Sequence, residues 1–195
     1  MERSAEISRK TAETDIRVRL NLDGTGQSLI QTPAGFFNHM LTLFSRHSLF
    51  DLEVRAAGDC EVDFHHLVED TGIVLGEAFL KALEGKESIR RYGSFYVPMD
   101  ESLGFSAVDI SGRPYIFFMA DFLKDKVGEF DVELVEEFFK AFVNSAKITL
   151  HIEVIRGWNT HHMIESIFKS FARSLREAVS FDEREKGIPS TKGIL

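Results

Sequence analysis

The spacing of hydrophobic and polar residues changes several times along the first half of the chain. Over residues 15–22 apolar and polar side chains alternate, which predicts a half-buried strand. A glycine-containing turn at 23–26 is followed by residues 27–32, which we interpret as the returning strand of a hairpin. The spacing then predicts a helix over 36–44, a strand over 49–56 and a helix over 63–83.

The second half of the chain repeats this order. The pattern predicts short strands at 95–97, 106–110 and 115–119, a helix at 131–144, a strand at 148–155 and a helix at 160–179. In both halves strands are followed by helix, strand and helix, so we infer a duplicated unit. We expect two similar halves, 1–92 and 93–195, which together form one compact unit and end in a glycine- and proline-containing loop.

One short phrase occurs twice, at the start of the last helix predicted in each half. His65-His66 is followed three residues later by Glu69, and His161-His162 is followed in the same way by Glu165. Four of the seven histidines lie in these two phrases, and His161 comes 96 positions after His65 in a chain of 195. Imidazole and carboxylate groups in this arrangement are typical of metal ligands.

Helix geometry divides each phrase between two sites. Because each residue advances by roughly 100°, His65 and Glu69 lie on one helical face, with His66 about a quarter-turn away. Adjacent histidines therefore do not converge easily on one ion. We predict that each helix contributes one histidine to each of two centres.

The repeat adds two further candidate ligands. Aligning the helices that precede the two phrases places His39 opposite Glu137. Eight candidates then divide into two sets of four, and imidazole with carboxylate suits Mn²⁺, although iron, cobalt or zinc also fits these ligand types. The eight candidate ligands are His39, His65, His66, Glu69, Glu137, His161, His162 and Glu165.

Composition excludes several classes of protein. A chain of 195 residues with 44% hydrophobic residues can bury a proper core. We see no apolar run near the ~20 residues of a membrane span and no secretory signal. The single cysteine, Cys60, excludes an internal disulfide and fits the reducing cytoplasm, where we expect the protein. A net charge of −8 without a basic stripe argues against a nucleic-acid partner.

Several motifs, in order and over nearly the whole chain, resemble one family, imidazoleglycerol-phosphate dehydratase of histidine biosynthesis. No fused phosphatase domain is present, so the resemblance is to the monofunctional form. Besides the two histidine phrases, the motifs are Thr11-Ala12-Glu13-Thr14, Leu22-Asp23-Gly24-Thr25-Gly26, Phe37-Asn38-His39-Met40-Leu41, Arg91-Tyr92-Gly93, Asp109-Ile110-Ser111-Gly112-Arg113-Pro114 and Ile188-Pro189-Ser190-Thr191-Lys192-Gly193.

The resemblance implies an α+β fold of the ribosomal protein S5 domain 2 type, in which each half is a four-stranded sheet with two helices on one face. It implies a homo-oligomer of 24 copies with sites between subunits. It also implies a manganese-dependent hydro-lyase with two Mn²⁺ per active site. The reaction would convert imidazole glycerol phosphate to imidazole acetol phosphate and water.

The same resemblance assigns roles to residues. The eight candidate ligands match the family's ligand positions, although some relatives carry histidine where this chain has Glu137. We expect Glu165, beside the metals, to act as the base and Glu13 to handle the departing hydroxyl or its water. The substrate's phosphate requires cations and hydroxyl donors. The candidates for binding it are His47, Arg91, Arg113, Ser190 and Lys192.

The chemistry explains why two centres would be needed. The proton to be removed is bound to carbon and is not acidified by a carbonyl group, so metal ions on both ring nitrogens would stabilise the negative charge on an imidazolate. Two other interpretations use the same ligands. One is a dinuclear metallohydrolase of a phosphorylated metabolite, and the other is an assembly whose ions only hold subunits together.

Overall fold

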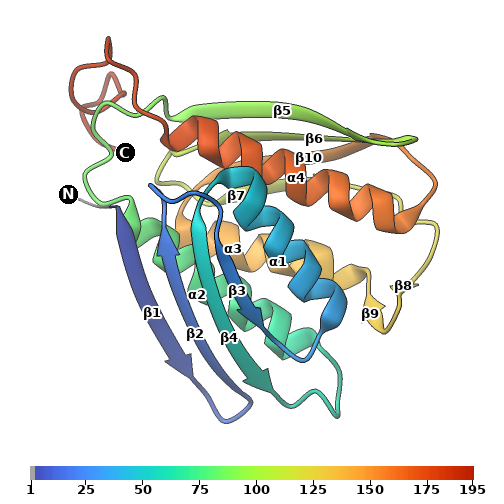
Figure 1. Cartoon of the computed structure of the whole chain (residues 1–195). Coiled ribbons are helices and arrows are strands. Elements are labelled where there is room, and N and C mark those ends of the chain that lie inside the picture. The colour runs from blue at the N-terminus through green and yellow to red at the C-terminus, as the bar shows by residue number, and fades with distance from the viewer. Residues whose placement is uncertain (1–2) are drawn as a thin grey trace.

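Two four-stranded sheets lie on opposite sides of a layer of helices, α1 to α4 (Figure 1). The computed structural model describes residues 3–195, so Met1 and Glu2, at the start of the expected first half, lie outside the described residues. Within 3–195 no helix combines the length and apolar composition needed to cross a membrane.

The first half contributes one sheet with two helices on its inner face. Its strands are ordered β1-β2-β4-β3, with β3 and β4 parallel and the other neighbours antiparallel. The elements are β1 (Ser4–Lys10), β2 (Thr14–Asn21), β3 (Ser28–Gln31), α1 (Gly35–Ser48), β4 (Asp51–Gly58) and α2 (His65–Ala82).

The second half has the same topology. Its sheet is ordered β5-β6-β10-β7, again with one parallel pair, β7 and β10, at the edge. This correspondence confirms the predicted α+β fold of two repeated halves. The residue 92 boundary that we expect falls at the first residue of β5. The elements are β5 (Tyr92–Met99), β6 (Ser102–Asp109), β7 (Tyr115–Met119), β8 (Lys126–Val127), β9 (Phe130–Asp131), α3 (Glu133–Ala146), β10 (Thr149–Arg156) and α4 (Thr160–Val179).

The predicted hairpin of 15–22 with 27–32 is wrong. β2 pairs with β4, and β3 lies on the far side of β4 in parallel. Asp51 at the start of β4 explains the crossing, because its Oδ1 accepts backbone N–H groups of Thr25 and Gln27 at 2.8 Å each. These bonds hold the segment after β2 across the beginning of β4.

Some short elements are absent from the sequence prediction. In β1 only Ala5 is buried, so this edge strand lacks the alternation that marks a half-buried strand. β8 and β9 are two residues each and form a small hairpin. The helices are predicted better, since each has an apolar stripe, and the segment 160–179 coincides with α4.

The helices of the two halves pack closely on one another. Phe44 of α1 stacks on Phe171 of α4 with ring centroids 5.7 Å apart. Between α2 and α3 the backbones approach through glycines. A Cβ added at Gly76 would lie 2.6 Å from the carbonyl oxygen of Phe142 and 2.8 Å from Ser145 Cβ. The relative position of the two halves therefore depends on small residues in this contact.

We expect Gly76→Ala to lower the free energy of unfolding by about 1–3 kcal/mol, because the added methyl group has no room against α3. Thermal or urea unfolding of the purified protein measures this loss. Gly35→Ala is the matched control, since nothing lies within 4 Å of a Cβ added there. A Gly76→Ala variant as stable as the Gly35→Ala variant would contradict the close approach of the helices.

Candidate metal centre

Three potential ligands meet where α1 of the first half packs against α4 of the second half. Glu165 Oε1 lies 2.8 Å from His39 Nε2 and 3.2 Å from His161 Nε2. Potential ligand atoms of all three residues lie within 4.8 Å of one another. Glu165 is only 8% exposed, whereas both histidines are more open. The carboxylate therefore forms the floor of a cluster that an ion can reach from solvent.

Lys169 completes this cluster from the next turn of α4. Its Nζ lies 2.5 Å from Glu165 Oε2. Burial raises the pKa of Glu165, but hydrogen bonds from Lys169, His39 and His161 more than offset it and lower the pKa to about 2. The carboxylate is therefore ionised at neutral pH, as a metal ligand must be.

Within each His-His pair the two rings point in different directions. The rings of His161 and His162 are inclined by 84°, and those of His65 and His66 by 88°. The second histidine of each pair contacts a carboxylate through Nδ1. His162 Nδ1 lies 2.8 Å from Glu101 Oε2, and His66 Nδ1 lies 3.0 Å from Asp59 Oδ2. In each ring this arrangement leaves Nε2 available to an ion.

The other helix pair, α2 with α3, carries the equivalent candidates His65, Glu69 and Glu137. His39 and Glu137 each occupy the fifth position of a 14-residue helix, as the repeat predicts. Glu69 and Glu137 line a common hollow with Lys140, whose Nζ lies 3.0 Å from Glu137 Oε1. Within residues 3–195 only His39, His161 and Glu165 meet as a ready group of ligands.

Glu13 lies in the turn between β1 and β2, beside the first His-His pair. Its Oε2 is 3.8 Å from His66 Nδ1, and its side chain is 55% exposed. Glu13 is thus close enough to act on a molecule bound at His66.

The candidates for phosphate binding fall into two groups. Arg91 donates to both oxygens of Asp109, at 2.7 and 3.2 Å, and to the carbonyl oxygen of Pro189 at 2.9 Å. Arg113 lies 3.9 Å from the same Asp109 carboxylate. The loop that carries Ser190 and Lys192 is thereby held against Arg91.

His47 is not in that group. It lies at the end of α1, and burial together with the positive charges of Lys169, Arg173 and Arg46 lowers its pKa.

The backbone N–H of Arg91 donates to the carbonyl oxygen of Ala178 at the far end of α4. Ala178 is thirteen residues from Glu165 on that helix. The group around Arg91 and the metal cluster around Glu165 are therefore about 20 Å apart. One small substrate cannot contact both groups within a single chain.

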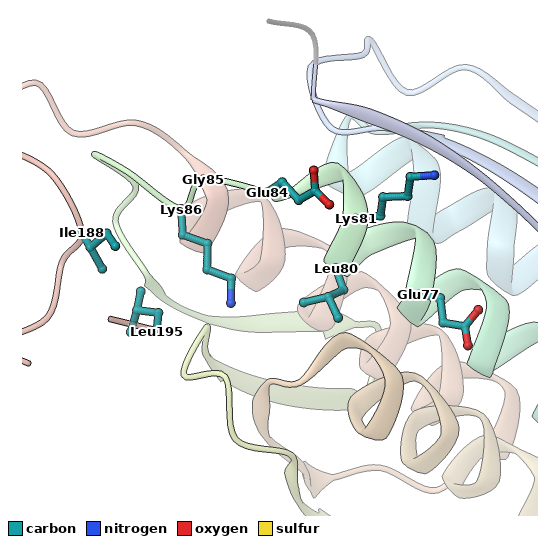
Figure 2. Close-up of a pocket in the computed structure, with 8 residues that line it drawn as sticks. All are labelled: Glu77, Leu80, Lys81, Glu84, Gly85, Lys86, Ile188 and Leu195. Atoms are coloured by element: carbon teal, nitrogen blue, oxygen red, sulfur yellow. The ribbon is translucent and has the colours of Figure 1, made fainter. Parts of the chain in front are cut away.

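One of the cavities has no histidine in its lining (Figure 2). It has a volume of about 630 Å³, between the end of α2 and the C-terminal loop. Leu80, Ile188 and Leu195 supply its apolar wall, and Lys81 and Lys86 lie at its sides. It contains none of the eight candidate ligands, so we locate the chemistry at the α1–α4 cluster instead.

Three residues that the structure brings to the histidines have no role predicted from the sequence. They are Asp59, Glu101 and Lys169. Only Lys169 has a local signal, because a lysine four residues after Glu165 shares its helical face. Asp59 and Glu101 reach the histidines from separate loops, which periodicity does not relate to the helices.

Known proteins resemble this chain over nearly its whole length. A family model described as imidazoleglycerol-phosphate dehydratase matches residues 32–175. A protein of that name from Clostridium kluyveri is 56% identical over 193 residues, which cover 99% of this chain and all of the relative. Another from Caldanaerobacter subterraneus subsp. tengcongensis is 58% identical with the same coverage.

Solved structures extend the similarity to the fold. The imidazoleglycerol-phosphate dehydratase of Staphylococcus aureus superposes with a TM-score of 0.84 at 47% identity, over 92% of this chain and 99% of that one. The enzyme of Pyrococcus furiosus gives a TM-score of 0.82 at 36% identity, over 97% and 100%. The chain belongs to the imidazoleglycerol-phosphate dehydratase family.

Proposed function

We propose that this protein is a metal-dependent hydro-lyase of histidine biosynthesis that converts imidazole glycerol phosphate to imidazole acetol phosphate and water. The observation that carries the proposal is the meeting of His39, His161 and Glu165 between the two halves of a chain of this family. We place the enzyme in the cytoplasm, because its single cysteine fits a reducing compartment.

The donor set fits a divalent ion. Two imidazole nitrogens and one ionised carboxylate lie within 4.8 Å, and this mixture suits Mn²⁺. We propose two such ions per site, held by the eight candidate ligands. When bound, they would supply Lewis acidity that stabilises negative charge on the substrate's imidazole ring.

Glu165 and Glu13 have different environments, which supports different roles for them. A carboxylate with a pKa of about 2 is a weak base, so the low pKa of Glu165 favours its role as an ionised ligand over proton abstraction. Glu13 is exposed beside His66 and can exchange a proton with a bound substrate or with water. We retain both residues as catalytic candidates and assign the departing hydroxyl group to Glu13.

The separation of the two candidate groups supports sites shared between copies. Arg91, Arg113, Ser190 and Lys192 gather near one end of α4, and His161 and Glu165 lie near the other. A small phosphorylated substrate therefore takes its phosphate contacts from one chain and its imidazole contacts from another. This arrangement requires a homo-oligomer, for which we propose the 24-copy assembly.

The outer face of the second sheet supports such an assembly. Cross-strand pairing places β5, β6, β10 and β7 side chains in rows on this face, one of which joins Tyr96, Phe105, Glu153 and Met119. Six of the side chains on this face are aromatic, and exposed patches of this kind mark protein contacts. The aromatic face consists of Tyr92, Tyr96, Phe105, Tyr115, Phe117, Met119 and His151.

Two other functions use the same ligands. A dinuclear hydrolase would release inorganic phosphate from the substrate, and a structural assembly would bind metal without turnover. The family relationship favours the dehydratase over both. The assay below distinguishes the three outcomes.

Stripping the protein with a chelator and adding Mn²⁺ back should restore formation of imidazole acetol phosphate without phosphate release. We expect Glu165→Gln to reduce the restored activity by about 10²–10⁴-fold, because a ligand and candidate base is lost. Glu129→Gln, on an exposed turn, is the matched control and should keep parental activity. Phosphate release, or bound manganese without turnover in the parent, would disprove the dehydratase.

Hybrid particles test whether sites are shared. Co-expressed Glu165→Gln and Lys192→Glu chains, purified through two different tags, should recover about a quarter of parental activity if each site draws on two copies. Each variant alone should be nearly inactive. Hybrids as inactive as the single variants would show that one chain supplies both groups.

Acid should release the metal, because an imidazole nitrogen that binds a proton cannot bind an ion. We expect metal content to fall as the pH drops below about 6, past the usual pKa of histidine, and particle mass to fall with it. Metal analysis and light scattering at pH 7.5 and 5 measure both quantities. Unchanged metal content and mass at pH 5 would contradict this expectation.

A further inference from the structure

The repeat places one glutamate at the same point of each half, immediately before the second strand. Glu13 precedes Thr14 of β2, and Glu101 precedes Ser102 of β6. Each lies beside the second histidine of its own half. Their environments are nevertheless different, and this difference indicates what each residue does.

Glu101 is fully engaged. Its side chain is 12% exposed, and Oε2 lies 2.8 Å from His162 Nδ1. The other oxygen, Oε1, accepts hydrogen bonds from Asn159 N at 2.8 Å, Trp158 N at 3.3 Å and Ser102 Oγ at 2.9 Å. Glu101 thus joins the β5–β6 turn to the segment that leads into α4.

In the first half another residue makes the equivalent contact. The loop from β4 to α2 spans 59–64, whereas the loop from β10 to α4 spans only 157–159 and contains no carboxylate. The longer loop supplies Asp59, which contacts His66 Nδ1 at 3.0 Å. Glu13 is therefore left 3.8 Å away and largely exposed.

We propose that Glu101 and Asp59 are the positioning residues for His162 and His66, and that Asp59 leaves Glu13 free to act on substrate. A carboxylate that accepts the Nδ1–H group fixes the tautomer in which Nε2 carries the lone pair. The role given to these contacts, which is to prepare Nε2 for an ion, rests on the proposed metal-dependent function. The tautomer of each histidine can be observed in the metal-free chain.

The Glu101–His162 and Asp59–His66 contacts should respond differently when the carboxylate is replaced by an uncharged amide. In Glu101→Gln, three donors require the amide oxygen at the Oε1 position, so the amide nitrogen must face His162 and donate to Nδ1. That reversal favours the Nε2–H tautomer, which cannot bind an ion through Nε2. Asp100, at 3.9 Å from His162 Nδ1, is too far away to accept a hydrogen bond in place of Glu101. The hydrogen bonds of the described residues give Asp59 no backbone donor, so Asp59→Asn can turn its oxygen toward His66.

The experiment uses the full chain with ¹⁵N-labelled histidine, studied by magic-angle-spinning NMR in the metal-free state. The parent should show His162 and His66 as Nδ1–H tautomers. Glu101→Gln should convert His162 to the Nε2–H tautomer, and Asp59→Asn should leave His66 unchanged. His162→Gln and His66→Gln identify the signals.

Binding of Mn²⁺, followed by the EPR signal of free ion, gives the second readout. We expect Glu101→Gln to weaken binding by about 10–100-fold and Asp59→Asn to bind as the parent does. Asn159→Ala removes the cap bond to His161 N and controls for general loosening of α4. It should lower the melting temperature without changing the tautomer of His162.

An Nε2–H signal for His162 or His66 in the parent, or an unchanged tautomer of His162 in Glu101→Gln, would overturn the proposal. If Glu101→Gln does not fold, the tautomers of His162 and His66 in the parent spectrum still test the proposal. A parent with the expected tautomers that binds no Mn²⁺ would instead disprove the metal-dependent function and leave the positioning contacts standing.

Discussion

The contact on which this structure depends is a buried carboxylate shared by side chains from both halves of the chain. Glu165 belongs to α4, and His39 reaches it from α1 of the other half. Burying a charge is costly unless it is paired, and Lys169 with the two histidines supplies the pairing. The cluster therefore exists only when both halves have folded and packed. In this protein the interface between the repeats and the candidate centre are the same place.

Much of the site could be predicted, because helical periodicity is local. The angle between adjacent histidines and the equivalence of His39 and Glu137 both follow from positions within one helix or its repeat. The pairing of β3 with β4 could not be predicted in this way. It depends on Asp51, which accepts hydrogen bonds from Thr25 and Gln27, more than 20 residues earlier in the chain. The carboxylate partners of His66 and His162 could not be predicted for the same reason. Asp59 and Glu101 lie on loops whose paths are set by tertiary packing.

The two halves also show how a duplicated site diverges. The α1–α4 pair and the α2–α3 pair each place a lysine beside their acidic candidate ligands, but the two lysines lie on helices that are not equivalent in the repeat. Lys169 lies on α4, where the equivalent position of α2 is Ile73. Lys140 lies on α3, where the equivalent position of α1 is Thr42. Lys169 pairs with one carboxylate, Glu165, whereas Lys140 pairs with two, Glu136 and Glu137. Each helix pair therefore keeps a lysine beside its carboxylates, although the lysine comes from a different helix.

The two outer sheet faces have opposite character, although their topology is the same. The outer face of the first sheet carries charged side chains such as Arg17, Arg19, Glu53 and Arg55, whereas the second carries the aromatic face. A charged face stays in contact with water at little cost, whereas an apolar aromatic face gains free energy when it is covered. The divergence of the repeats thus gives the two sheets different solvation, although their strand order is the same.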